Sequence, residues 1–380
     1  MTAVTPLPPA LDDAAILAFV ERIVAIESPT HHPRGVNAAL DAAAALFSGT
    51  GAALRRIPCP GQGDMLEIRL HPGRPGPGVV VFAHMDTVHP VGALAATLKM
   101  RREGDKLYGP GIYDMKGGLA LALFAAKAIL DGQRATRGPV TVLITPDEEI
   151  GSPASRAHIE ALARENRAAL VVEPARDGGR IVTARKGVGR FVVSARGAPS
   201  HAGSKHGEGA SAISEMARQI AIIDGFTDYA RGITVNIGKI SGGTAVNVTA
   251  EHCVAEIDLR VTDAKAGEEM TARFHALKPV DPRVTLSVTG EMNRPAFARD
   301  KGIDALFETA RGIAAEIGFD LVSAPLAGGG SDGNFAVAVG TPTLDGLGVD
   351  GAGAHTNDEH ILVSSIGPRA RLLQALMERA

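Results

Sequence analysis

Five motifs place histidines and carboxylates, the side chains that hold divalent metals in hydrolases, at the ends of apolar runs or in glycine-rich turns. A two-metal site needs several such ligands and one that both ions share. A lone histidine is more often a structural or surface residue than a ligand, but the joint occurrence of five groups predicts a metal site. The candidates are His84 in HMDTV, Asp114 in GPGIYDMKGG, Glu149 in PDEEIGS, Glu173 in VVEP and His355 in GAHTNDEH.

Two further acids lie beside these candidate ligands. Asp86 follows His84 by two residues, so on a strand the two side chains share a face and Asp86 can orient the imidazole through its other nitrogen. The alternative is a turn-forming aspartate ahead of Thr87. Glu148 and Glu149 are adjacent and repel each other unless a cation absorbs the charge. One of them could then bind metal while the other takes a proton from water, although the pair taken alone fits a solvated acidic turn better.

The elements that must position these residues follow an alternating pattern. Short continuous apolar runs, typical of strands buried on both faces, end at His84, ahead of Glu148 and ahead of Glu173. Apolar residues at helical spacing predict helices over 11–26 and 116–130. Strands that alternate with helices and deliver polar residues at their carboxyl ends predict an α/β fold with a central, mostly parallel sheet and its site along that edge.

A second pattern begins near residue 187. Strand-like and helix-like segments follow there in the order β-α-β-β-α-β, which is typical of a ferredoxin-like α+β unit. Gly187 and Gly189 flank its start and Pro295 follows its end. We therefore expect a domain at 187–294 inserted into a domain made of 1–186 and 295–380, since 380 residues exceed the roughly 250 to 300 that one core supports.

Composition excludes several classes of protein. The chain is 45% hydrophobic and 21% charged, as in soluble globular proteins, and its 39 basic and 42 acidic residues with 4% aromatics give no basic stripe for nucleic acid. Cys59 and Cys253 have no metal-site or disulfide spacing. We find no secretory signal at the N-terminus and no apolar stretch that could span a membrane, so a cytoplasmic location is expected. A serine hydrolase is disfavoured, because the G-x-S-x-G pattern at 329–333 (GGSDG) lies in a glycine-rich run and does not follow an apolar, strand-like run.

The motifs above, together with GAPSHAG and GGGSDGN, occur in the order of a large metallopeptidase family. Over nearly its whole length the chain resembles the dinuclear zinc family of glutamate carboxypeptidase, aminoacylase, acetylornithine deacetylase and succinyl-diaminopimelate desuccinylase, and it is most similar to the glutamate carboxypeptidase branch. The resemblance implies a zinc-peptidase-like catalytic domain and an inserted lid and dimerisation domain. It also implies a homodimer through that lid, and two Zn²⁺ per chain, with Co²⁺ or Mn²⁺ as possible substitutes.

Matching motifs carry the roles of the family over to this sequence. One zinc would be held by His84 and Glu173, and the other by Glu149 and His355, with Asp114 bridging the two. Glu148 matches the general base and Asp86 the carboxylate behind the first histidine. In the inserted domain, His201 matches a histidine that supports the oxyanion of the reaction. In many members of the family, this histidine reaches into the active site of the partner subunit. The expected substrate contacts are Asn247, Arg260, Arg294, Gly330 and Ser331.

The resemblance implies hydrolysis of a peptide or N-acyl amide bond next to a free carboxylate. Arg294, in NRPAF, lies where glutamate-releasing members carry an arginine for the terminal carboxylate, and a planar guanidinium suits such a group. Release of a C-terminal amino acid, as by a glutamate carboxypeptidase, is the first hypothesis. An N-acyl-amino-acid deacylase is the alternative within the enzyme class. A metal- or peptide-binding relative without catalytic activity is a more remote alternative, because the residues expected as metal ligands and as general base are all present.

Overall fold

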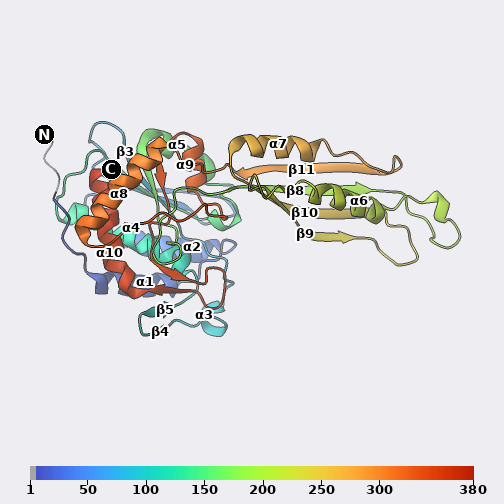
Figure 1. Ribbon diagram of the computed structural model, residues 1–380. Coiled ribbons are helices and arrows are strands. Elements are labelled where there is room, and N and C mark those ends of the chain that lie inside the picture. Colours follow the sequence, from blue (N-terminus) through green and yellow to red (C-terminus); the bar gives the residue numbers. More distant parts are fainter. Residues whose placement is uncertain (1–5) are drawn as a thin grey trace. The chain divides into compact units, whose positions relative to one another are not determined.

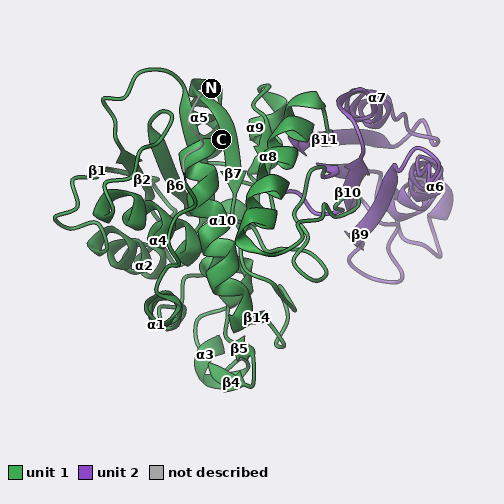
Figure 2. Cartoon of the chain, turned by 60° about the vertical axis from the view of Figure 1, so that its left-hand side comes forward, with its two compact units in different colours: residues 1–184, 299–327, 331–380 green, residues 185–298, 328–330 purple. Residues whose placement is uncertain are grey.

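The computed structural model describes residues 6–380 and divides the chain into two compact units, coloured separately in Figure 2. Unit 1 comprises 1–184, 299–327 and 331–380, and unit 2 comprises 185–298 and 328–330. Residues 1–5 of the expected first domain lie outside the described part. The short segment 328–330 belongs with unit 2, where Arg185 donates a hydrogen bond to the carbonyl of Gly329 and Arg260 donates one to that of Gly328.

Unit 1 contains a six-stranded sheet in which β3 is central and fully buried. Hydrogen bonds connect the strands in the order β1-β2-β6-β3-β7-β12, parallel from β6 to β12 and antiparallel at β1 and β2. The expected mostly parallel sheet is therefore confirmed. The strands are β1 (Ala53–Ile57), β2 (Met65–Leu70), β3 (Gly78–His84), β6 (Val140–Thr145), β7 (Asn166–Val171) and β12 (Thr343–Leu344).

Helices cover this sheet (Figure 1). Val80 and Phe82 of β3 pack with side chains of α5 and α9, and α4 contacts β3 and β6 and packs against α1 and α10. Asp12 caps α1 by accepting the N–H of Ala15. The helices expected over 11–26 and 116–130 are thus α1 and α4. The helices of unit 1 are α1 (Asp13–Val24), α2 (Pro33–Ala45), α3 (Ala93–Ala96), α4 (Gly117–Asp131), α5 (Arg156–Glu165), α8 (Lys301–Ile317), α9 (Gly333–Ala338) and α10 (Ile366–Arg379).

A small second sheet in unit 1 joins segments that are distant in the sequence. Its order is β13-β14-β5-β4, and β14 pairs antiparallel with β5 so that His360 lies opposite Tyr108. Figure 2 shows β5 and β14 together. The pairing brings the segment after His355 beside the segment that leads to Asp114. The strands are β4 (Arg101–Glu103), β5 (Lys106–Tyr108), β13 (Gly351–Ala352) and β14 (His360–Leu362).

Unit 2 is an α+β unit with the expected β-α-β-β-α-β order. Its antiparallel sheet runs β11-β8-β10-β9, and α6 and α7 pack on it around a core that includes Phe191, Met216, Met270 and Phe274. Strands β9 and β11 are the two edges. The elements are β8 (Gly187–Arg196), α6 (Ala212–Asp224), β9 (Thr234–Gly242), β10 (His252–Val261), α7 (Ala264–His275) and β11 (Thr285–Arg294).

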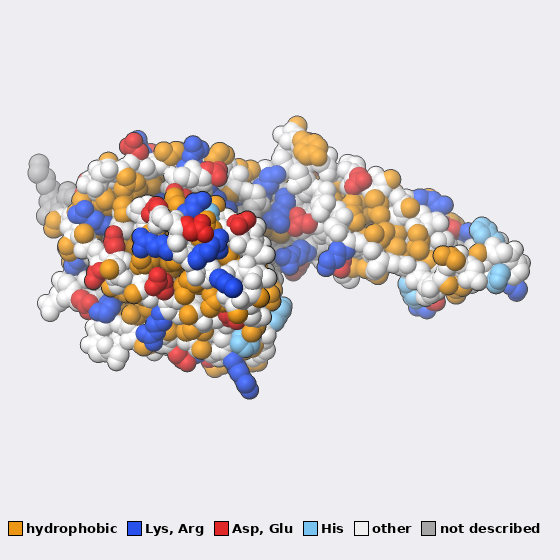
Figure 3. Space-filling model, turned by 90° about the horizontal axis from the view of Figure 1, so that it is seen from below, with side chains coloured by type: hydrophobic (Ala, Val, Ile, Leu, Met, Phe, Trp, Pro, Cys, Tyr) orange, Lys and Arg blue, Asp and Glu red, His pale blue; other side chains and the backbone are white. Residues whose placement is uncertain are grey.

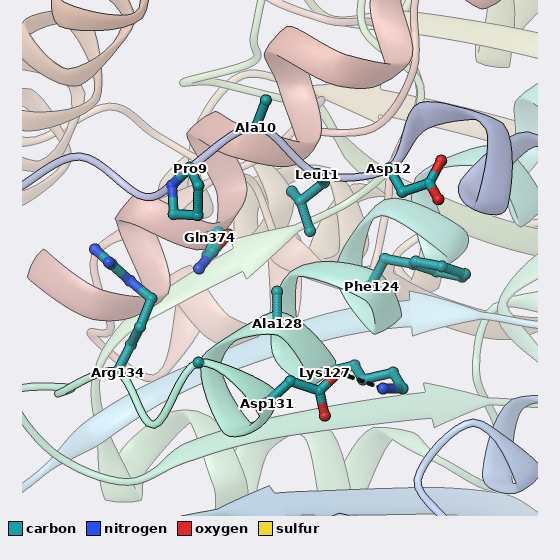
Figure 4. A pocket seen from close by; sticks show the side chains of 11 residues that line it. Pro9, Ala10, Leu11, Asp12, Phe124, Lys127, Ala128, Asp131, Arg134 and Gln374 are labelled. Carbon is teal, nitrogen blue, oxygen red and sulfur yellow. Dashed lines mark hydrogen bonds and ion pairs between the residues drawn. The ribbon is translucent and has the colours of Figure 1, made fainter.

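One surface pocket lies apart from the candidate metal ligands. A pocket of about 560 Å³ lies between the N-terminal segment at Pro9 and Leu11, helix α4 at Phe124 and helix α10 at Gln374, and contains none of the candidate ligands (Figure 4). Acidic and basic side chains are mixed on the face shown in Figure 3. Among residues 6–380, no helix has the length and apolar character needed to cross a membrane.

Candidate active site

The carboxyl edge of the main sheet gathers the candidate ligands of unit 1. His84 is the last residue of β3, Glu148 and Glu149 begin the 3-10 turn that follows β6, and Glu173 lies two residues beyond β7. Because these three strands are parallel, their ends meet at one edge. His84 Nε2 accordingly lies 3.8 Å from Glu173 Oε1.

Asp114 lies between two histidines. Its Oδ1 is 3.3 Å from His84 Nε2, and its Oδ2 is 3.2 Å from His355 Nε2. His355 Nε2 is also 3.3 Å from Glu149 Oε2. One carboxylate therefore presents a separate oxygen to each of two imidazoles, as a ligand shared by two ions must. The five residues expected as ligands are brought together around it.

Protonation within this cluster shows how strongly its charges interact. Burial acts to raise the pKa of Asp114, but hydrogen bonds from His355 and His84 outweigh it and lower that pKa. The hydrogen bonds that His355 donates to Asp114 and then to Glu149 raise the pKa of the imidazole to about 10. Burial raises the pKa of Glu149, although its hydrogen bond with His355 opposes the shift. Hydrogen bonds to these carboxylates thus favour the protonated form of the His355 imidazole.

The donor set fits divalent metal ions. Ligand atoms of His84, Glu148 and Glu173 lie within 4.8 Å of one another, and so do those of His84, Asp114 and Glu149. Glu149 Oε1 is buried and has no hydrogen-bond partner among residues 6–380. Buried polar atoms are almost always paired, so an unpaired carboxylate oxygen inside a cluster of imidazoles indicates a position for a cation. Nitrogen and carboxylate donors of this kind suit zinc and similar ions.

Asp86 is fully buried and supports the turn that carries the glutamates. Its Oδ1 accepts the backbone N–H of Glu148 and its Oδ2 that of Glu149, each at 3.2 Å, while Thr30 donates to Oδ2 at 2.7 Å. His84 Nδ1 lies 2.9 Å from the backbone oxygen of Asp86 and 3.4 Å from its Oδ1. The imidazole is thus oriented more closely by the main chain of Asp86 than by its side chain, which primarily holds the turn.

Two residues that the sequence analysis did not single out complete the support of the cluster. Glu359 is buried and accepts the backbone N–H groups of Gly111, Tyr113 and Asp114, each at 2.9 Å. His89 Nε2 lies 2.6 Å from Glu359 Oε2. Glu359 belongs to the GAHTNDEH motif, but neither its residue type nor its spacing indicates that it reaches back across 245 residues to Asp114.

The remaining candidates of the sequence analysis lie mainly in unit 2. His201 is exposed, and its Nδ1 accepts the N–H groups of Gly203 and Ser204, while the carbonyl of Asn247 accepts the N–H of Ala202 nearby. His201 and Asn247 therefore lie on neighbouring segments. The His201 side chain is exposed, and Nδ1 is the ring nitrogen that accepts these two hydrogen bonds.

Arg260 and Arg294 lie near the glycine segment 328–330. Arg260 forms a two-point ion pair with Asp258 at 2.7 and 2.9 Å. Arg294, at the end of β11, is 4% exposed, and a Cβ on Gly330 would come within 2.5 Å of its Cδ, so a larger residue at 330 would displace the Arg294 side chain. Ser331, in unit 1, is fully buried, and its hydroxyl donates to Asp345.

Comparison with known proteins places the chain in a family. Residues 80–379 match the model of Peptidase family M20/M25/M40. Carboxypeptidase G2 of Pseudomonas sp. is 30% identical over 96% of this chain and 90% of its own length, and a succinyl-diaminopimelate desuccinylase of Cupriavidus taiwanensis is 29% identical over 81% and 83%. The fold is similar to that of aminopeptidase PepT from Bacillus cereus, with a TM-score of 0.77, 24% identity and coverage of 97% and 98%.

A mostly parallel α/β sheet with candidate metal ligands at its carboxyl edge, together with a second α+β unit, is the fold of a class of peptidases and amidohydrolases. The chain is an enzyme of this class, and it belongs to Peptidase family M20/M25/M40. Members of this family generally bind a metal, and the clusters around His84 and Asp114 are the candidate ligands in this chain. The resemblance found in the motifs is confirmed.

Proposed function

We propose that the protein is a dinuclear zinc hydrolase that releases a C-terminal amino acid from a peptide or N-acyl substrate, with glutamate as the first candidate. The observation that carries the proposal is the position of Asp114, whose two oxygens face His84 and His355 at 3.3 and 3.2 Å. The similarity to carboxypeptidase G2 supports a carboxypeptidase.

These contacts support the proposed assignment of ligands. His84 and Glu173 would hold one ion, Glu149 and His355 the other, and Asp114 would bridge them. Zinc in such a site acts as a Lewis acid that polarises a carbonyl and makes water more acidic. Co²⁺ and Mn²⁺ accept the same donors and are expected substitutes.

Glu148 is the proposed general base. Its carboxylate lies within 4.8 Å of ligand atoms of His84 and Glu173, and its backbone N–H is held by Asp86. A carboxylate so placed can take a proton from the attacking water and deliver it to the leaving amine. Glu149, its neighbour, is paired with His355 and serves as a ligand instead.

The substrate carboxylate requires a cationic partner in the protein. Arg294 and Arg260 are the proposed contacts, with Asn247, Gly330 and Ser331 as further contacts. A buried guanidinium such as that of Arg294 binds a carboxylate in a planar, two-point geometry. A substrate with a free carboxylate next to the cleaved amide fits these groups.

A deacylase is the second candidate, and the 29% identity to a desuccinylase favours it. In that reaction the amine that leaves still carries the carboxylate, but the acyl group is a small or fatty acyl chain. A non-catalytic metal-binding relative is disfavoured because Glu148 and all five candidate ligands are present. The choice between the two enzymes depends on which acyl group and which amino acid the protein accepts.

Unit 2 is the proposed lid and dimerisation domain. Its edge strand β9 exposes Ile240, and Val246 beyond the strand is fully exposed, as expected of a surface that pairs with a second copy. In such a homodimer, the exposed His201 would support the oxyanion in the partner's site.

A cytoplasmic location of the protein stays a prediction.

Metal analysis combined with substrate profiling tests the function. Purified protein is assayed for zinc and for hydrolysis of a panel of N-acyl amino acids and C-terminal dipeptides, with and without chelator. About two zinc per chain and chelator-sensitive release of glutamate would support the carboxypeptidase. Preferential cleavage of a small acyl group from other amino acids would establish the deacylase, and a protein with neither metal nor turnover would overturn both.

A further inference from the structure

Glu359 is a buried carboxylate whose hydrogen bonds all converge on the site. Its Oε1 accepts the N–H groups of Tyr113 and Asp114, and its Oε2 accepts that of Gly111 and lies 2.6 Å from His89 Nε2. A carboxylate can only accept in these contacts, so the imidazole of His89 donates. Glu359 and His89 are 1% and 7% exposed. Four donors thus fix one buried side chain.

This side chain links the two segments that present Asp114 and His355. Glu359 follows His355 by four residues and directly precedes β14, which pairs with β5 just before the turn that leads to Asp114. Gly111, within that turn, has a φ of 68°, and a Cβ there would come within 2.2 Å of Thr87 Cγ2. The turn is therefore packed against the HMDTV motif on one side and tied to Glu359 on the other.

We propose that Glu359 and His89 form a positioning clamp that sets the separation of Asp114 from His84 and His355, and thereby the affinity of the site for its metal ions. The proposal rests on the proposed function, since it concerns the ions that these ligands would hold. His84 and Asp114 are joined by no backbone pairing in the described chain, so their 3.3 Å separation depends on how the Asp114 turn is held. Glu359 accepts the N–H groups of three residues of that turn, Gly111, Tyr113 and Asp114.

Replacement of the carboxylate by an amide separates this role from packing. Glu359→Gln keeps the volume of the side chain but substitutes an NH₂ donor for one oxygen, so that donor faces N–H groups or the imidazole. A buried donor without an acceptor is unfavourable, and the turn relieves the conflict by shifting. Side chains that orient metal ligands typically change metal affinity by about 10- to 100-fold when replaced, so we expect a loss of that size in Glu359→Gln.

The experiment measures zinc affinity directly rather than activity. Metal-free full-length protein is titrated with Zn²⁺ against a chromophoric chelator, and the visible spectrum of the Co²⁺-loaded protein reports ligand geometry. Glu215→Gln is the matched control, because Glu215 is also fully buried and accepts two backbone N–H groups, from Val280 and Asp281, within unit 2. Glu359→Gln should lose about 10- to 100-fold in affinity with an altered Co²⁺ spectrum, and Glu215→Gln should change neither.

Substitutions of His89 keep the proposal testable if Glu359→Gln does not fold. His89→Leu removes the donor while leaving the backbone contacts of Glu359 intact, and His89→Gln restores a donor. Weaker zinc binding in His89→Leu and recovery in His89→Gln support the clamp. Wild-type affinity and spectrum in Glu359→Gln, or in His89→Leu where the first variant is unfolded, would overturn it. Wild-type protein that binds no zinc would instead overturn the proposed function, so the two failures are distinguishable.

Discussion

The carboxylate of Asp86 accepts the backbone N–H of Glu148 at 3.2 Å. This hydrogen bond connects the HMDTV motif to the turn after β6, and the second oxygen of Asp86 forms the same bond with Glu149. The position of the proposed base therefore depends on an acid that is not among the proposed metal ligands. The relationship extends the role expected for Asp86, which is support of the His84 imidazole alone.

Asp86→Asn should lower kcat more than it lowers stability. The amide retains one acceptor, so one of the two N–H groups loses its partner and the turn moves. We expect kcat to fall by about 10- to 100-fold, measured together with the unfolding temperature. Asp131→Asn, at an exposed position on α4, is the control and should leave kcat unchanged. Equal kcat in Asp86→Asn and wild type would show that Asp86 does not position Glu148 for catalysis.

Zinc binding should become tighter as the pH rises. The pKa of His355 is raised to about 10 in the metal-free protein, whereas zinc binds the neutral imidazole, so zinc and the proton compete. Apparent affinity should therefore increase by up to about tenfold per pH unit for this proton until the pH nears that value. Calorimetry in buffers with different ionisation enthalpies measures the proton release. Binding without release near neutral pH would contradict the assignment of His355 as a ligand.

The raised pKa of His355 also makes the stability of the metal-free protein depend on pH. Because the folded-state pKa lies above the ordinary imidazole value of 6.5, the paired His355 contributes stability that is fully present below that value. This contribution is lost as the pH rises through about 10. Thermal unfolding of chelated protein between these limits should show the decline, and His355→Gln should lack it.

Arg294 should determine preference for carboxylate-bearing substrates. Arg294→Lys keeps the charge but loses the planar two-point geometry, so KM for such substrates should rise by about tenfold while kcat changes less. The matched comparison is a substrate with an amidated terminus, for which the variant and the wild type should differ little. If KM rises equally for both substrates, Arg294 has only a structural role in unit 2.

Mixed dimers test the proposed action of His201. His201→Ala and Glu148→Ala homodimers should both be impaired, each through loss of a different group. In a mixed dimer, one site would combine the intact Glu148 of one chain with the intact His201 of the other, so activity should be regained after the two variants are mixed and refolded. Activity no higher than that of the separate variants would mean that His201 does not act in the partner's site.

The sequence predicts those parts of this structure that depend on local patterns. Apolar runs predict β3, β6 and β7, and parallel strands must bring His84, Glu149 and Glu173 to one edge. Asp114 and His355 reach that edge through irregular turns, so their residue types and the glycine-rich motifs that contain them indicated them, and no strand pattern did. The contacts of Glu359 with Gly111 and Asp114 depend on the pairing of β5 with β14, short strands that carry no clear pattern.

The most direct test of the central claim is the zinc content and the turnover of one preparation of Glu148→Ala, measured beside wild type. If Glu148 is the base and the ligands are those that surround Asp114, the variant should retain about two zinc per chain. Its kcat should fall by about 10²- to 10⁴-fold, the usual contribution of a positioned acid–base group. Turnover at the wild-type rate with the metal still bound would contradict the account.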